Sequence, residues 1–251
     1  MPMLNHFAPP LSRHRNWTGF HSLWANVIAI HLNRTLPAGW VAEPHVQWRQ
    51  EADAIVVEDV DPPPAFTTAG PAGEGGTAVV KPPVAVAIPP RRSLEFDTDH
   101  DVTEVRVLDE RGKSLRLAAA VEIISPSNKD RPDERAAFVN KVGGYVAAGL
   151  GVAVLDPVFS SPRGLHRAVM QSLGDDDPEA DATYAAAYRL TPGERRRLEL
   201  WYEPLAVGAA LPSLPLFLKG GPAVELPLEA TYAEACLNTR VDMAAVLKEQ
   251  P

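Results

Sequence analysis

The segment AAAVEIIS, residues 118–125, constrains the fold of this chain more than any other. Its apolar residues suit a buried strand, which stops at the turn sequence Ser-Pro-Ser-Asn. Glu122 lies inside this apolar run, where a carboxylate is costly unless it is paired or binds a metal. We therefore expect a buried strand whose one charge has either a structural partner or a chemical role.

The elements around this strand alternate between helical and extended patterns. Thr18 is expected to cap the first helix, Asp133 caps the helix at 133–149, and Gly149 ends that helix. A β-hairpin signal at Asp109–Lys113 joins strand 103–108 to a strand that ends at Ile124. The other predicted elements are a helix over 18–36, strands over 40–48, 52–60, 151–158, 183–190 and 196–203, and helices over 165–173 and 229–239. This order is typical of an α/β fold, with Pro44 placing strand 40–48 at an edge or a bulge.

We expect residues 1–251 to form a single domain, because 251 residues suffice for one sizeable core. The core is predicted over about 17–160. A proline- and glycine-rich insertion occupies about 61–88, and a C-terminal extension over about 161–251 packs on the core.

Composition favours a cytoplasmic protein without a membrane segment. The sequence has no run of about 18 apolar residues and no secretory signal pattern at its N-terminus, and its one cysteine, Cys236, excludes an internal disulfide. A net charge of −8 argues against broad nucleic-acid coating but leaves room for a local basic groove. Arg195 and Arg197 share one face of a predicted strand, where they meet either phosphates or nearby acids.

Three polar residues stand where apolar ones are expected, and they are the candidate catalytic residues. Asp53 opens the strand AIVVEDV, Glu122 interrupts AAAVEIIS, and Lys141 lies at the edge of the apolar stripe of helix 133–149, with its stem packed inward. Two carboxylates on adjacent strands hold Mg²⁺ or Mn²⁺, and an ammonium group nearby orients a water molecule. The structural alternatives are a strand cap for Asp53, a core arginine partner for Glu122, and a solvent-directed Lys141.

The turn after the strand at 118–124 has two interpretations. Ser125 and Ser127 suggest nucleophiles, but no nucleophile-elbow glycines accompany them, so turn formation is the simpler role. Asn128 and Lys129 either line the mouth of a cleft or lie in a solvated turn.

The chain resembles the bacterial domain-of-unknown-function family 4058 from about Trp17 to Leu237. The most specific local marks are FHS, VEIISPSNK and a late LPSLPLFL run. A more distant resemblance links VEIISPSN, NKVGGY and GLGVAVLDP to the Uma-type restriction-endonuclease-like family of the PD-(D/E)XK nuclease superfamily.

The second resemblance implies a restriction-endonuclease-like α-β-β-β-α-β core with a mixed sheet flanked by helices. It implies that Asp53 and Glu122 are the metal carboxylates. Ile124 occupies the position where the superfamily motif has its lysine, and Lys141 on the following helix would replace that lysine.

Together these observations predict a Mg²⁺-dependent nuclease-like hydrolase with nucleic acid as its partner. The alternative is a non-catalytic binding or scaffold protein that retains the fold, and a small-molecule pocket beneath the 61–88 segment is a third hypothesis.

Overall fold

The computed structural model describes residues 2–47, 102–112, 114–177, 183–191 and 196–249. These residues belong to one compact unit, Met1–Arg49 with Asp99–Pro251. Asp53, the predicted strand over 52–60 and the 61–88 insertion lie outside the described residues.

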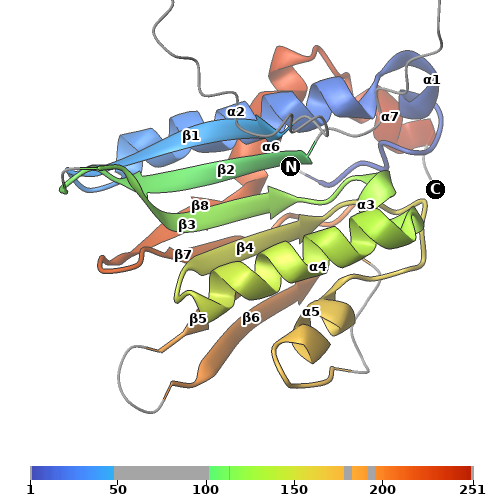
Figure 1. The fold of residues 1–251 in the computed structure, drawn as a ribbon. Helices are drawn as coiled ribbons and strands as arrows, with labels where there is room; N and C mark the ends of the chain where they lie inside the picture. The colour runs from blue at the N-terminus through green and yellow to red at the C-terminus, as the bar shows by residue number, and fades with distance from the viewer. Residues whose placement is uncertain (1, 48–101, 113, 178–182, 192–195, 250–251) are drawn as a thin grey trace, which may run out of the picture. The chain divides into compact units, whose positions relative to one another are not determined.

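Six strands form one mixed sheet in the order β1-β2-β3-β4-β5-β6 (Figure 1). Only β3 and β4 are parallel, because helix α4 (Pro132–Ala147) crosses between them, whereas every other neighbouring pair is antiparallel. The strands are β1 (Trp40–Gln47), β2 (Val102–Asp109), β3 (Arg116–Ile123), β4 (Gly151–Asp156), β5 (Tyr184–Leu190) and β6 (Leu198–Pro204). The prediction of an α/β protein with a mixed, helix-flanked sheet is confirmed.

Each face of the sheet is buried beneath helices. Helix α2 (Trp17–Thr35) and helix α6 (Leu228–Asn238) share one hydrophobic core with Val105, Val121 and Leu155. Helices α4 and α5 (His166–Ser172) share the second core with Val154 and Tyr188 on the opposite face. Three consecutive alanines lie in each of the interior strands β3 and β5, and such small side chains let helices approach a sheet closely.

The helix boundaries at the N-terminal ends differ from the prediction at two positions. Asn16, not Thr18, caps α2, because its side chain accepts a hydrogen bond of 2.9 Å from the Thr18 amide. Helix α4 starts at Pro132, so Asp133 lies in its first turn and Arg131 occupies the cap position, where its side chain makes no capping hydrogen bond. Gly149 ends α4 as predicted, with a positive φ of 80°.

Several elements escaped the sequence pattern because they are short. A small second sheet pairs β7 (Ser213–Phe217) with β8 (Ala223–Pro227). Gly151 at the start of β4 lets β7 come close, since a Cβ atom there would lie 2.2 Å from the Phe217 carbonyl oxygen. The other short elements are helices α1 (Leu11–His14), α3 (Pro126–Asp130) and α7 (Met243–Glu249).

Within the described ranges, no helix combines the length and the apolar character needed to cross a membrane.

Candidate functional site: a carboxylate pair with a lysine

Three strands bring polar side chains into one row across the sheet. His45 on β1 pairs in register with Glu104 on β2, and Glu104 pairs with Glu122 on β3. Residues in register point to the same face of a sheet, and the apolar neighbours Val105 and Val121 face the α2 core instead. The two glutamates therefore lie on the α4 face, where each is only 1% exposed.

Lys141 reaches this row from α4, which passes in front of β4 in Figure 1. Its Nζ donates to Glu122 Oε2 at 2.8 Å and to Glu104 Oε2 at 3.2 Å. The Lys141 side chain is 19% exposed, so the stem packs inward as predicted while the ammonium group joins two carboxylates. The structure thus brings two of the three predicted site residues, Glu122 and Lys141, into direct contact.

Arg106 and Tyr145 complete the polar surroundings of the pair. Arg106 Nε donates to Glu104 Oε1, and the Arg106 side chain remains about one-third exposed. Burial and the nearby carboxylates raise the pKa of the Tyr145 phenol, which keeps it neutral. Burial and the charge of Arg106 lower the pKa of His45, so its imidazole is neutral near pH 7.

The two glutamates have opposite protonation preferences. Burial raises the pKa of Glu122 to about 8 in spite of the Lys141 charge. Although burial by itself would raise the pKa of Glu104, a hydrogen bond with Glu122 and the charges of Lys141 and Arg106 lower it to about 2. At neutral pH the pair therefore shares one proton, because two adjacent buried carboxylates repel each other when both are ionised.

The oxygen atoms of this pair fit a hard cation in part. Glu122 Oε1 is buried and has no hydrogen-bond donor among the described residues, so a proton or a cation must compensate it. The described ranges contain no group of three acidic, histidine or cysteine side chains placed to hold a metal ion. A complete oxygen-ligand set would thus need a further carboxylate, and Asp53 lies outside the described residues.

Glu104, the carboxylate that pairs in register with Glu122, was not predicted from the sequence. The strand sequence TEVRV alternates polar and apolar residues, which places Glu104 and Arg106 on the face opposite Val105. The hairpin joining this strand to AAAVEIIS also predicted that the two strands are neighbours. What the sequence did not supply was the register that sets Glu104 beside Glu122.

The turn after β3 is a buried structural element, which contradicts both predictions for Asn128 and Lys129. Ser125 is the N-cap of α3, and Asn128 Oδ1 accepts from the Ser125 amide at 2.9 Å as the N3 side chain of a capping box. Lys129 is 1% exposed, and its Nζ donates to Asp156 Oδ1 at 3.0 Å and to the Val158 carbonyl oxygen at 3.1 Å. Both side chains are therefore buried structural groups, and they neither line the mouth of a cleft nor lie in solvent.

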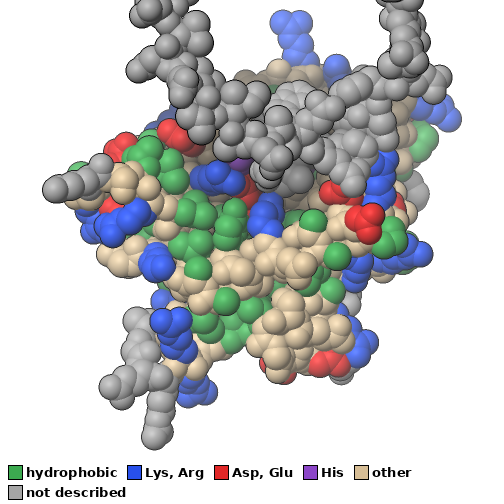
Figure 2. Space-filling view, viewed as in Figure 1, with side chains coloured by type: hydrophobic (Ala, Val, Ile, Leu, Met, Phe, Trp, Pro, Cys, Tyr) green, Lys and Arg blue, Asp and Glu red, His purple; other side chains and the backbone are tan. Residues whose placement is uncertain are grey.

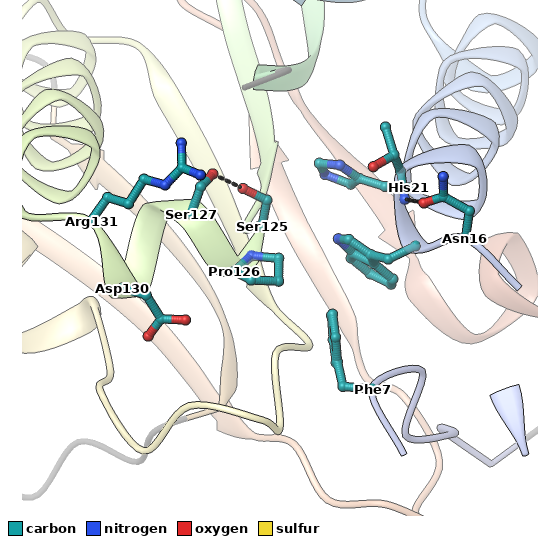
Figure 3. Close-up of a pocket in the computed structure, with 10 residues that line it drawn as sticks. Phe7, Asn16, His21, Ser125, Pro126, Ser127, Asp130 and Arg131 are labelled. Carbon is teal, nitrogen blue, oxygen red and sulfur yellow. Dashed lines mark hydrogen bonds between the residues drawn. The ribbon is translucent and has the colours of Figure 1, made fainter. Parts of the chain in front are cut away.

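A cavity of about 370 Å³ lies beside this turn, between the start of α2 and α3 (Figure 3). Ser125 and Ser127 line it, and their hydroxyl oxygens are 2.8 Å apart. His21 lines the opposite side, where its ring stacks on Trp17 and its Nε2 lies 2.8 Å from the Ile123 carbonyl oxygen. Burial lowers the pKa of His21 to about 4.

The chain matches no family model, no curated protein and no solved structure.

Proposed function

We propose that the protein is a cytoplasmic divalent-metal-dependent phosphodiester hydrolase, and that Glu104, Glu122 and Lys141 form part of its active centre. The observation that carries this proposal is one lysine bonded to two buried carboxylates on adjacent strands. Hydrolysis of a phosphodiester needs carboxylate oxygens for a hard cation and a positive group for the phosphate.

The element order supports a restriction-endonuclease-like core. In the described residues, α2 is followed by β1, β2 and β3, and then by α4 and β4, apart from the short α3. This is the α-β-β-β-α-β order that the resemblance to Uma-type nucleases implies. We also propose, from the resemblance of the FHS, VEIISPSNK and LPSLPLFL segments, that the chain is a member of domain-of-unknown-function family 4058.

In this proposal Glu122 and Glu104 hold the metal ion, and Asp53 stays a ligand predicted from the sequence alone. A bound Mg²⁺ would polarise the phosphate and lower the pKa of an attacking water. Lys141 orients both carboxylates and carries the positive charge that faces the phosphate. Glu122 must lose its proton before it binds a cation, so metal affinity should increase as the pH rises towards 8.

The test is calorimetric titration of Mg²⁺ and Mn²⁺ at pH 8 into the wild type and the variants Glu122→Gln, Glu104→Gln and Asp53→Asn. We expect each variant to lose at least about tenfold in affinity, whereas Asp109→Asn, at the other end of β2, should match the wild type. Cleavage of single- and double-stranded oligonucleotides should fall about 100-fold or more in Lys141→Met. Absence of Mn²⁺ binding by the wild type would contradict the proposal.

The non-catalytic binding or scaffold protein is the competing function. One observation favours it: both carboxylates are almost fully buried and already bonded to Lys141. If metal binding is absent and Lys141→Met chiefly lowers thermal stability, the cluster is a structural charge network.

A further inference from the structure

A second cavity, distinct from the carboxylate pair, lies at the opposite end of β3. Its volume is about 760 Å³, within the range of small-molecule sites. The turn between β7 and β8 forms one wall, and the ends of β1, β5 and α4 form the others. The backbone of Lys219 in that turn is anchored to β3, because its amide donates to the Ala118 carbonyl oxygen at 3.0 Å.

Among the described residues, four cationic side chains and no acidic one line this cavity: Arg111, Arg189, Arg196 and Lys219. In Figure 2, Lys and Arg side chains gather at the left end of the molecule, where the tips of these strands lie in Figure 1. The whole chain carries a net charge of −8, so this concentration of positive charge is a local feature.

Two of the arginines are held in place by packing on aromatic rings. The Arg111 guanidinium lies 3.7 Å from the Trp40 ring centroid, and the Arg189 guanidinium lies 3.8 Å from the Phe217 ring centroid. Asp109 bonds Arg111 and Glu199 bonds Arg189, both from outside the cavity lining. Such preorganised guanidinium groups lose little conformational entropy when they bind an anion.

The other two cations supply the uncompensated charge. Lys219 Nζ donates at 2.7 Å to the Ala148 carbonyl oxygen at the end of α4, which is a neutral acceptor. Arg196 is exposed, and neither cation forms an ion pair with an acidic side chain of the described ranges. A ligand with several negative charges would neutralise both.

We propose that this basic cavity binds a ligand that carries two or more phosphate groups. Planar guanidinium groups and an ammonium group are the side chains that bind phosphate oxygens most strongly. The proposal is independent of the hydrolase proposal, because Glu104, Glu122 and Lys141 do not line this cavity.

The test uses inorganic pyrophosphate and ADP as probes, with adenosine as the uncharged comparison, in calorimetry at about 50 mM salt. The double variant Arg196→Glu/Lys219→Glu removes the two uncompensated cations. The control Arg34→Glu/Lys248→Glu changes the net charge equally at exposed positions on α2 and α7. We expect the cavity variant to lose about tenfold or more in affinity for both probes, and the control less than about twofold.

The outcomes separate the alternatives. Loss of pyrophosphate and ADP binding in the cavity variant alone, with a melting temperature close to that of the wild type, supports the proposal. Equal weakening in the two variants overturns it, because that result reports only net charge. Absence of pyrophosphate binding by the wild type, or adenosine binding as tight as that of ADP, also overturns it.

Discussion

Two lysines meet buried acids on the same side of the sheet, but their surroundings differ. Lys129 and Asp156 are both fully buried and form an ion pair, and Lys129 also donates to the Val158 carbonyl oxygen. Lys141 is partly exposed and serves two glutamates at once. The Lys129 pair therefore links α3 to β4 inside the protein. In the Lys141 cluster, by contrast, two glutamates share a proton and the lysine side chain is partly exposed to solvent.

This contrast teaches that a buried lysine–acid contact does not by itself mark an active site. Each cluster contains one acid with a raised pKa, since burial raises the pKa of Asp156 to about 7 and that of Glu122 to about 8. What separates the clusters is the ratio of acids to lysines and the access of the ammonium group to solvent.

The largest effect on stability is expected from Lys129→Met. This change removes from a fully buried site both the cation paired with Asp156 and a hydrogen bond to the Val158 carbonyl oxygen, which together should lower the free energy of unfolding by about 3–5 kcal/mol. The matched variant Lys141→Met should cost only about 1–2 kcal/mol, because Glu104 keeps Arg106 and Glu122 is protonated. Urea unfolding at pH 7 measures both values, and equal losses would remove the distinction between the two clusters.

The next effect is the pH dependence of stability. The pKa of Glu122 is about 8 in the folded protein against 4.5 as its ordinary value, so between these values the folded state holds a proton that the unfolded state has lost. Its contribution to stability is complete below pH 4.5 and falls by about 1.4 kcal/mol per pH unit until the pH passes 8.

Glu122→Gln should remove this slope, as measured by urea unfolding at pH 5, 6, 7 and 8. Asp156→Asn serves as the comparison, because it removes the parallel slope that ends near pH 7. Glu104, with its pKa lowered to about 2, contributes stability that is lost only as the pH falls below 4.5. An unchanged slope in Glu122→Gln would mean that Glu122 is ionised at neutral pH.

The smallest effect is expected at the helix that carries Lys129. Asn128→Ala removes the side chain that accepts from the Ser125 amide, and should cost about 1–2 kcal/mol. Asn128→Asp retains an acceptor and should recover most of that loss. If Asn128→Ala leaves the melting temperature unchanged, the Lys129–Asp156 ion pair keeps α3 in place without the capping-box hydrogen bond.

The local pattern determined much of the fold. Periodicity located α2, α4 and the strands β1 to β6 to within about two residues, because long amphipathic helices and buried strands repeat at 3.6 and 2.0 residues. It missed β7, β8 and the five-residue α3, which are too short to show a period. It also misplaced the caps, since Ser, Thr, Asp and Asn near a helix start are nearly interchangeable candidates.

The candidate site was less accessible from sequence. A charge inside an apolar strand was enough to identify Glu122 as a candidate. The apolar stripe of the helix at 133–149 was enough to predict that the Lys141 stem packs inward. Only tertiary structure decided that Lys141 meets Glu122, that Glu104 is the adjacent carboxylate, and that Lys129 pairs with Asp156. These contacts depend on strand register and helix placement, which join residues distant in sequence and leave no local signal.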